Sequence, residues 1–255
     1  MNLQPVRRHT VADDVFEQLV AEVSGLAPGE SLPSERRLTE VLGVSRPVVR
    51  EALQRLSHAG LVEVRQGDAT TVRDFRRDGG LDLLARLLVP ARGLDVAVAR
   101  SIVEARHLVG PTVAELAASR PDIDDAAVRL TQLAAALRAT TDPVTRQRLA
   151  LEFWDVVIDA ADSLVFRLMF NSLRAAYEPM LDALASLIDG ADQPERYDAL
   201  AAALADRDPA RARAAAEDLL GPATTALLSA LDDLDAPGPG APAPAGADRD
   251  GQEDA

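Results

Sequence analysis

Cysteine and lysine are absent from this chain of 255 residues, and aromatic side chains make up only 3% of it. Without cysteine the chain can form no disulfide, no thiolate zinc site and no cysteine nucleophile. Because aromatic residues are so scarce, its cores must be built from leucine, valine and alanine, a composition that favours packed helices over sheets. All 27 basic residues are arginines, so any basic surface must consist of guanidinium groups.

Long uncharged apolar runs are also missing. Arg7, Arg8 and Asp13 are among the charges that interrupt the first 25 residues, so the sequence predicts neither a signal peptide nor a membrane span. We therefore expect a cytoplasmic protein without a membrane partner.

Sequence signatures of catalysis are missing too. There is no Gly-rich phosphate loop, no Gly-x-Ser-x-Gly elbow and no His-Glu-x-x-His motif. The three histidines, His9, His58 and His107, are scattered, and none is positioned as a general base beside a nucleophile. The sequence therefore argues against an enzyme and against a resident cofactor.

The net charge of −14 is unevenly distributed. Residues 1–78 contain 11 arginines and 12 acidic residues, whereas the remainder contains 16 arginines and 29 acidic residues. The excess of acid lies outside the N-terminal part, so the total charge does not exclude a nucleic-acid partner for that part.

Residues 28–62 predict two short helices joined by a tight turn. Ser34 is placed to cap the first helix, and Gly43 supplies the left-handed residue that ends it. The apolar residues of this helix fall at helical spacing and are expected to share one side: Leu38, Val41 and Leu42.

The second helix follows Ser45, which can cap it, and carries Pro47 in its first turn, where a missing N–H costs nothing. Its apolar side is formed by Val49, Leu53 and Leu56. Its opposite side carries Arg46, Arg50 and Gln54. A helix with an apolar side and an arginine-bearing side, placed after a tight turn, is typical of a DNA-reading module.

A first helix and a wing complete this module. Thr10 and Asp13 form a capping-box pattern before a helix whose apolar residues share a face: Val11, Val15, Leu19, Val20 and Val23. Residues 61–64 and 70–72 are short β-type runs joined across residues 66–68, as expected for a two-stranded wing.

The predicted fold is mainly α, with a winged helix-turn-helix in residues 1–73, a linker in 74–80 and an all-helical bundle in 81–233 that forms an effector domain. Residues 234–255 are rich in Pro, Gly, Ala and Asp and are expected to be disordered. Turn-forming segments separate the predicted helices of the bundle at residues 90–93, 121–125, 140–143, 160–163 and 190–194.

Leu-Pro-Ser-Glu-Arg at residues 32–36, followed by Gly-Val-Ser-Arg-x-x-Val-Arg-Glu-Ala-Leu at 43–53, resembles the winged helix-turn-helix of the GntR family of bacterial transcription regulators. The match covers about residues 10–73. Residues 73–84 and 152–177 are similar, through sparser identities, to the linker and ligand-binding domain of the FadR-like subfamily. The resemblance implies a homodimer that binds double-stranded DNA at a palindromic operator, and a helical domain that binds a small-molecule effector.

Most members of the wider subfamily hold a divalent metal with one Asp and three His. The matching positions here are Ala150, Trp154, Tyr197 and Leu219, none of which is an ordinary metal ligand, so no metal is expected. FadR regulators themselves also lack the metal and take acyl-CoA thioesters. The resemblance therefore implies a long-chain acyl-CoA or similarly apolar effector and a role in fatty acid metabolism.

Candidate DNA-binding residues lie at the start of the second helix and at the wing tip. Arg46 and Arg50 are candidates for base reading, because the guanidinium fork donates two parallel hydrogen bonds to guanine, whereas Arg36 is placed for a phosphate contact. Ser45 either caps the helix or also touches the DNA backbone. The remaining candidates are Pro47 and Val48, together with Gln66 and Gly67, which either enter the minor groove or form an ordinary turn.

Candidate effector-binding residues lie in the helical part: Arg106, Trp154, Asn171, Tyr177 and Tyr197. Arg106 can meet an anionic effector or form a salt bridge with Glu104 or another acid. Trp154 can line a pocket or pack in the core. Asn171 and Tyr177 can point into the pocket or bond a buried carbonyl.

Two further interpretations stay open for the helical part. Its effector can be a small organic acid, or the helices can dimerise without any ligand. Thermal stabilisation by candidate ligands separates a sensor from a pure assembly domain, because a ligand that binds the folded state must stabilise it.

Overall fold

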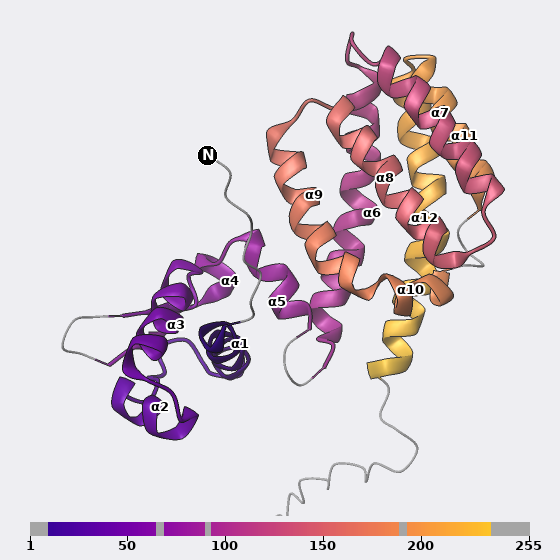
Figure 1. Ribbon diagram of the computed structural model, residues 1–255. Coiled ribbons are helices and arrows are strands. Elements are labelled where there is room, and N and C mark those ends of the chain that lie inside the picture. The colour runs from indigo at the N-terminus through magenta and orange to yellow at the C-terminus, as the bar shows by residue number, and fades with distance from the viewer. Residues whose placement is uncertain (1–9, 65–68, 90–92, 189–192, 236–255) are drawn as a thin grey trace, which may run out of the picture.

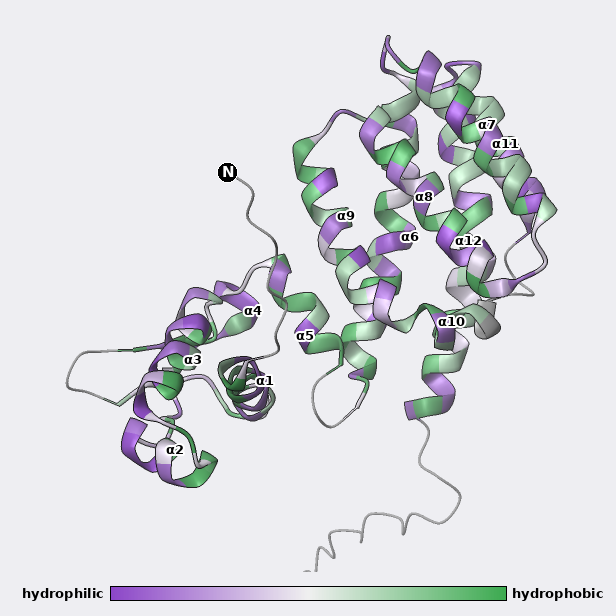
Figure 2. Cartoon of the chain, viewed as in Figure 1, coloured by the Kyte–Doolittle hydropathy of each residue, from purple (hydrophilic) through white to green (hydrophobic). Residues whose placement is uncertain are grey.

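The computed structural model describes residues 10–64, 69–89, 93–188 and 193–235. A small N-terminal domain lies beside a larger helical domain, and short helices connect them (Figure 1). Most helices carry hydrophobic and hydrophilic residues on different sides, and each domain has its own core (Figure 2). The fold is therefore mainly α, as predicted. In the described part of the chain, no helix is long and apolar enough to cross a membrane.

Helix α1 (Val11–Val23) begins with the predicted capping box. The Thr10 hydroxyl accepts the backbone N–H of Asp13 at 3.3 Å, and the Asp13 carboxylate accepts the N–H of Thr10 at 2.9 Å. The predicted apolar face is buried except for Val11, the first residue of the helix, which is 57% exposed.

Helix α2 (Glu35–Leu42) is capped as expected by Ser34, whose hydroxyl accepts the N–H of Arg37 at 3.3 Å, and it ends at Gly43 with φ +65°. Its apolar side is narrower than predicted. Leu38 is buried, whereas Val41 is 65% exposed, because this eight-residue helix packs on its neighbour through a single turn.

Helix α3 (Arg46–His58) begins after Ser45, but the Ser45 side chain makes no capping hydrogen bond. An N-cap side chain bonds the N–H of the second or third helical residue. Here the second residue is Pro47, which has no N–H, and the N–H of the third residue, Val48, donates to the Ser45 carbonyl at 3.1 Å. Ser45 occupies the cap position only through its backbone.

The wing is a two-stranded antiparallel sheet of β1 (Val62–Glu63) and β2 (Thr71–Val72), shorter than the β-type runs in the sequence. Val62 pairs with Val72 and both are buried, which ties the wing to the core of the N-terminal domain. The wing tip, with the candidates Gln66 and Gly67, lies outside the described residues.

The segment predicted as a linker contains a helical turn, α4 (Phe75–Asp78), which runs on through the 3-10 turn η1 (Leu81–Leu83) into α5 (Leu84–Leu88). This segment packs closely on the N-terminal domain. A Cβ on Gly60, which has φ +73°, would lie 2.7 Å from the carbonyl oxygen of Asp78. Glycine at this position therefore allows α4 to approach the end of α3.

The helical domain follows the predicted breaks and adds two that the sequence did not predict. One is the 3-10 turn η2 (Glu178–Met180), and the other precedes the last helix, where Arg207 has φ +54°. The helices are α6 (Val96–Ala118), α7 (Asp124–Ala139), α8 (Pro143–Ala160), α9 (Leu164–Tyr177), α10 (Leu181–Ile188), α11 (Pro194–Ala205) and α12 (Pro209–Asp235).

Helices α6 and α12 pack along most of their lengths at the centre of this domain (Figure 1). Each contains an internal Gly-Pro pair, with Pro111 in α6 and Pro222 in α12. A proline removes the donor for the carbonyl four residues earlier. At Pro222 that carbonyl belongs to Asp218, and Arg196 of α11 donates to it at 3.1 Å.

Candidate DNA-binding surface and ligand cavity

The solvent-facing side of α3 carries three polar side chains at successive helical turns: Arg46, Arg50 and Gln54. All three residues are exposed, and they are spaced four residues apart, so they form one stripe along the helix. No ion pair or hydrogen bond joins Arg46 to another described residue. The Arg50 Nε lies 3.2 Å from the Glu35 carboxylate of α2. A helix with this stripe has the size and donor set to enter a major groove.

Packing on α1 fixes the orientation of α3. Val49, Leu53 and Leu56 are buried against α1, on the side opposite the stripe. At the far end of α3, Arg55 donates to the Asp13 carboxylate at 2.8 Å, and its guanidinium lies 4.3 Å from the Phe16 ring centre. Because α1 holds α3 by both apolar and ionic contacts, the stripe is presented on a rigid support.

The carboxyl of Asp13 takes part in both the cap of α1 and the contact with α3. The backbone N–H of Thr10, and after it the Arg55 guanidinium, hold the pKa of this carboxyl well below its usual range. Asp13 therefore remains ionised at any pH at which the domain would bind DNA.

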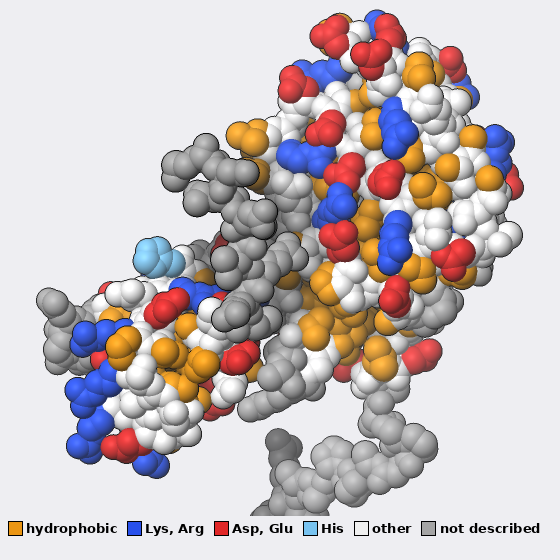
Figure 3. Space-filling view, viewed as in Figure 1, with side chains coloured by type: hydrophobic (Ala, Val, Ile, Leu, Met, Phe, Trp, Pro, Cys, Tyr) orange, Lys and Arg blue, Asp and Glu red, His pale blue; other side chains and the backbone are white. Residues whose placement is uncertain are grey.

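The first turn of α2 adds two exposed arginines beside the stripe. The side chains of Arg36 and Arg37 are 77% and 65% exposed, and both approach the Glu40 carboxylate, at 3.6 and 3.5 Å. Basic side chains gather along one edge of the N-terminal domain (Figure 3). Ser45 and Pro47 are exposed at the start of α3, between α2 and the stripe, whereas Val48 is half-buried against the core.

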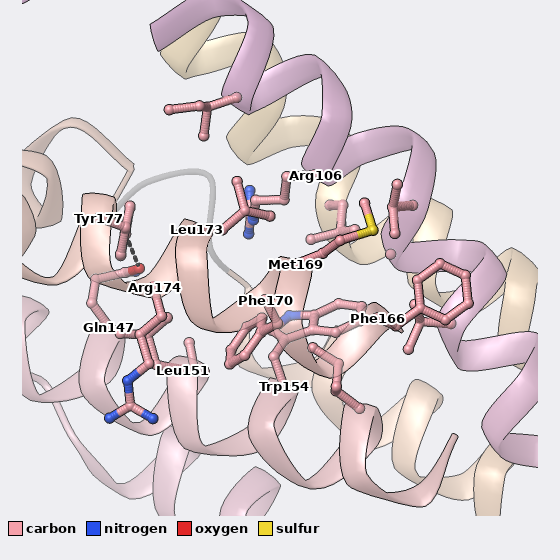
Figure 4. Close-up of a pocket in the computed structure, with 17 residues that line it drawn as sticks. Arg106, Gln147, Leu151, Trp154, Phe166, Met169, Phe170, Leu173, Arg174 and Tyr177 are labelled. Atoms are coloured by element: carbon pink, nitrogen blue, oxygen red, sulfur yellow. Dashed lines mark hydrogen bonds between the residues drawn. The ribbon is translucent and has the colours of Figure 1, made fainter. Parts of the chain in front are cut away.

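The helical domain encloses a cavity of about 120 Å³, which we call the upper cavity. Its walls come from α6, α8 and α9, and Leu220 of α12 closes one side (Figure 4). Most of the lining is apolar. The α9 wall includes one polar residue, Arg174, and five residues that fall on one side of the helix: Phe166, Met169, Phe170, Leu173 and Tyr177.

Five polar side chains line the upper cavity. The Tyr177 hydroxyl donates to Gln147 Oε1 at 2.9 Å (Figure 4). The buried indole N–H of Trp154 has no hydrogen-bond partner among the described residues. The two arginines at the cavity differ. Arg174 pairs with Asp155 and Glu178, whereas Arg106 makes no ion pair or hydrogen bond within the described chain.

Gly110 gives the Trp154 ring its place in the upper cavity. A Cβ on Gly110 would lie 2.4 Å from Leu220 Cδ1 and 3.3 Å from Trp154 Cη2. Glycine inside a helix costs about 1 kcal/mol relative to alanine. Alanine at this site would require the Leu220 side chain to move and the indole to shift slightly.

The structure brings together three of the five residues that the sequence assigned to effector binding. Arg106, Trp154 and Tyr177 line the upper cavity. Asn171 does not line it, and this residue is exposed on α9. Tyr197 of α11 lies in the core, where its ring meets the Phe153 ring edge to face at 5.1 Å.

Sequence reasoning missed most of the cavity wall, including Gly110, Gln147 and Phe170. The repeat of large apolar residues along α9 was the available signal, because its spacing places them on one face. Nothing in the sequence identifies the α8 residue that bonds Tyr177, since its position depends on how α8 and α9 pack.

The four positions that the resemblance matches to metal ligands carry no ordinary ligand side chain. Ala150 and Trp154 line the upper cavity with a methyl group and an indole, and Tyr197 and Leu219 are buried in the core. Among the described residues, no group of three or more His, Cys, Asp or Glu side chains is placed to hold a metal ion.

Comparison with known families matches both domains. Residues 11–72 match the model described as "Bacterial regulatory proteins, gntR family", and residues 101–221 match the FCD domain. A solved structure from work on Lar and the Listeria monocytogenes agr system has a TM-score of 0.54 at 16% identity, over 88% of this chain and 99% of that one. That likeness concerns the fold alone.

Three relatives differ in how much of the chain they match. "HTH-type transcriptional regulator Mce2R" of Mycobacterium tuberculosis is 55% identical over 91% of this chain and 97% of its own length. The uncharacterized regulator Rv0494 of the same species is 32% identical over 88% and 89%. "Fatty acid metabolism regulator protein" of Vibrio cholerae is 43% identical, but over only 30% of this chain and 26% of its own length.

These matches cover the N-terminal winged helix-turn-helix domain and the helical domain, in the order in which the structure shows them. The chain therefore belongs to the GntR family of bacterial regulatory proteins, as a FadR-like helix-turn-helix transcriptional regulator whose C-terminal part is an FCD domain.

Proposed function

We propose that this regulator binds a palindromic DNA operator as a homodimer and that an organic anion with an apolar body, bound in the upper cavity, changes its DNA affinity. The observation that carries the effector half of the proposal is Arg106. Its guanidinium is only partly exposed at a largely apolar cavity and has no acidic partner in the described chain. A partly desolvated cation without a partner is costly, and a bound anion would compensate it.

The other polar groups of the cavity support the same ligand class. The Trp154 N–H is a donor without an acceptor, and a carboxylate oxygen is an acceptor. Arg174 is already neutralised by Asp155 and Glu178, which leaves one uncommitted cation for the ligand. A single carboxylate on an apolar body satisfies these groups. A long-chain acyl-CoA is the larger member of this class and a small organic acid the smaller one.

On the DNA side, Arg46 and Arg50 read guanines in the major groove, and Arg36 contacts a phosphate. Glu35 holds the Arg50 guanidinium in place until DNA is bound. Ser45 offers an exposed hydroxyl to the DNA backbone, and Pro47 and Val48 offer apolar surface at the helix start, suited to a thymine methyl group. Gln66 and Gly67 remain candidates for a minor-groove contact of the wing.

The homodimer is supported by a patch of exposed apolar side chains on the outer face of α9. Leu164, Val165 and Leu168 are 74%, 66% and 55% exposed. Each chain carries one stripe and reads one half-site, so a second copy supplies the other half of a palindrome. Replacing Leu164 and Leu168 together by Glu should shift the mass measured by light scattering from dimer to monomer.

The test is DNA binding by fluorescence anisotropy at fixed salt, using DNA from the regulator's own upstream region. Dodecanoate, dodecanoyl-CoA and a metal chelator are added in separate titrations. We expect an effector to lower DNA affinity and the chelator to have no effect. Release by dodecanoate alone assigns a free acid, and release by dodecanoyl-CoA alone assigns the thioester.

Arg106→Gln removes the proposed anion anchor with little change in shape, and it should abolish most of the response. Arg129→Gln is the matched control, since Arg129 is an exposed arginine of α7 that pairs with Glu152 away from the cavity. A response that survives Arg106→Gln unchanged would refute the anchor. A response to neither probe by the wild-type protein would refute the effector class.

A further inference from the structure

The segment after α12 divides into an uncharged part and a charged part. Residues 236–247, which we call the spacer, consist of Ala, Pro and Gly only. Residues 248–255, which we call the acidic head, contain four acids and one arginine, a net charge of −3. Both parts lie outside the described residues. Because the head has no large apolar side chain, it can bind another surface only through its charges and polar groups.

Helix α12 ends near the connection between the two domains. Leu231 and Leu234, in its last turns, line the same apolar cavity as Leu88 of α5. Arg86 of α5 in turn pairs with Glu17 of α1 in the N-terminal domain. The spacer therefore leaves the helical domain at the end that α5 joins to the N-terminal domain (Figure 1).

The spacer is long enough to carry the acidic head to either side of the N-terminal domain. A compact domain of about 65 residues is about 30 Å across. An extended chain spans about 3.3 Å per residue, so the spacer alone reaches up to about 40 Å and the whole segment up to about 66 Å. Reach therefore does not limit which surface of that domain the head can bind.

Charge does limit it. Within the described residues 10–64 and 69–82, three exposed arginines make no side-chain ion pair: Arg46 on α3, and Arg76 and Arg77 on α4. The surroundings of these two places differ. Residues 34–50 contain four arginines and two acids, whereas residues 73–82 contain three arginines and three acids. Charge complementarity therefore directs an acidic segment to α2 and the start of α3.

We call the four arginines of residues 34–50 the basic edge: Arg36, Arg37, Arg46 and Arg50. Carboxylates of the same domain already bind three of them. The Arg50 Nε lies 3.2 Å from the Glu35 carboxylate, and Arg36 and Arg37 approach Glu40 at 3.6 and 3.5 Å. Arg46 has no such partner among the described residues. The basic edge therefore accepts carboxylates, and one of its guanidinium groups is open for another.

We infer that the acidic head binds the basic edge of its own chain and competes with DNA for it. This inference rests on the proposed DNA-binding surface and adds an inhibitor of that surface. The carboxylates of the head take the place of DNA phosphates at Arg46 and its neighbours. Only the form of the protein in which the head has left the basic edge binds DNA.

The expected inhibition is partial. Exposed ion pairs are individually weak, but a short tether holds the head at an effective concentration in the millimolar range. We expect the head to lower DNA affinity by about three- to tenfold at low salt. Because the competition does not depend on base sequence, it lowers affinity for operator and unrelated DNA by the same factor, and weak non-specific sites become the emptier ones.

Neutralising the head in the full-length protein tests the inference. The variant combines Asp248→Asn, Asp250→Asn, Glu253→Gln and Asp254→Asn. DNA affinity is measured by fluorescence anisotropy with DNA from the regulator's own upstream region and with unrelated DNA. At about 50 mM salt both affinities should rise by about three- to tenfold, and at about 300 mM salt the gain should fall below about twofold, because salt screens exposed charges.

A matched control removes three Asp and one Glu from the helical domain. It combines Asp122→Asn, Asp125→Asn, Asp182→Asn and Glu195→Gln, all exposed acids that pair with no described arginine. Its net charge changes by the same amount as that of the head variant. If the control gains as much DNA affinity as the head variant, the net charge of the protein accounts for the effect and the docked head is refuted.

A nitroxide label locates the head directly. The chain contains no cysteine, so Ala255→Cys provides a single labelling site beside the acids. The label should broaden the backbone amide signals of α2 and of the first turn of α3 in the full-length protein. DNA should restore these signals, and so should about 300 mM salt. Broadening confined to α4, or none in the N-terminal domain, would overturn the inference.

Failure of the inference can be told apart from failure of the proposed DNA-binding surface. Unchanged DNA affinity of the head variant at low salt would overturn the competition, while Arg46→Ala would still weaken DNA binding. If Arg46→Ala leaves DNA affinity unchanged, the DNA-binding surface itself is wrong and the competition at that surface falls with it.

Discussion

The cores of the two domains are built from the same types of apolar residue, but one domain carries its candidate functional side chains on its surface and the other carries them in its interior. In the N-terminal domain the stripe of Arg46, Arg50 and Gln54 points outward from one helix, and a short stretch of sequence specifies it. In the helical domain the candidate site points inward, and four helices contribute to it. To predict a site on the outside of one helix, it is enough to predict that helix correctly. To predict a site between helices, the packing of several helices must be predicted correctly.

The largest expected effect tests whether the two domains are independent. Leu56 of α3 is fully buried in the N-terminal core, so Leu56→Ala should destabilise that domain by about 2–5 kcal/mol and abolish specific DNA binding. In urea unfolding, Trp154 fluorescence reports on the helical domain alone, whereas circular dichroism reports on the helices of both domains. We expect the fluorescence transition of the helical domain to stay in place.

Val41→Ala is the control for this variant, because Val41 is an apolar residue of the same domain that is 65% exposed. It should change stability by no more than about 0.5 kcal/mol. If Leu56→Ala shifts both transitions together, the domains unfold as one unit and the comparison between them fails.

The next largest effect concerns base reading. Arg46→Ala and Arg50→Ala should each lower specific DNA affinity by about 5- to 150-fold, equivalent to about 1–3 kcal/mol, and relax the preference at one guanine. Selection of binding sites from a randomised operator library measures both effects. Effector binding, followed by Trp154 fluorescence, should not change. Unaltered sequence preference in either variant would remove that arginine from the readout.

The sequence predicted most of the N-terminal domain because its signals are local. The capping box at Thr10, the cap at Ser34 and the left-handed Gly43 each depend on a few neighbouring residues, and all three are present. Ser45 takes the predicted cap position, but its side chain makes no capping hydrogen bond. The exposure of Val41 depends on how much of α2 its neighbour covers, and periodicity does not give that.

The cavity was predictable only in part. Periodicity places Phe166, Phe170 and Tyr177 on one face of α9, and the structure shows that this face lines the cavity. Periodicity does not say which helix lies opposite. Tyr197 was assigned to the site through an alignment position, yet α11 packs against Phe153 in the core instead. The wrong assignments of cavity residues came from contacts between helices that the sequence does not give.

A substitution inside the cavity gives an intermediate effect. Gly110→Ala adds a methyl group where Leu220 and Trp154 already lie, so it should reduce effector affinity by about tenfold. Overpacking costs about 1–3 kcal/mol, and the gain in helix propensity offsets about 1 kcal/mol of it, so folding stability should fall only slightly. Calorimetric titration with octanoate measures the affinity. Unchanged affinity would show that the indole does not border the ligand.

A smaller effect is expected for the phosphate contact. Arg36→Ala should weaken binding to all DNA sequences by a similar factor and reduce the slope of log affinity against log salt by about 1. Glu40→Gln should have the opposite effect on non-specific DNA affinity. It removes the acidic partner that Arg36 and Arg37 share, so non-specific binding should become stronger. A loss confined to one base position after Arg36→Ala would refute the phosphate role.

The smallest effect compares acid sensitivity between the domains. Each domain has a carboxyl whose pKa is lowered by hydrogen bonds. In α1 the backbone N–H of Thr10 is the main cause of the lowered pKa of Asp13. At the cap of α8 the Thr145 hydroxyl is the main cause of the lowered pKa of Asp142. A carboxyl with a lowered folded-state pKa stabilises the fold above the unfolded value of about 3.9, and the contribution is lost as the pH falls through the folded value.

Asp13→Asn should therefore flatten the loss of stability below about pH 4 in the N-terminal domain alone, and Asp142→Asn should do so in the helical domain alone. At neutral pH the two variants should differ little from wild type in Trp154 fluorescence, because the Asn oxygen can still accept the capping hydrogen bond from the backbone N–H. Thermal melts between about pH 2 and 7, followed by circular dichroism and by Trp154, assign each change to its domain. A change in the Trp154 melt caused by Asp13→Asn would mean that acid unfolding passes from the N-terminal domain to the helical domain, which α5 connects.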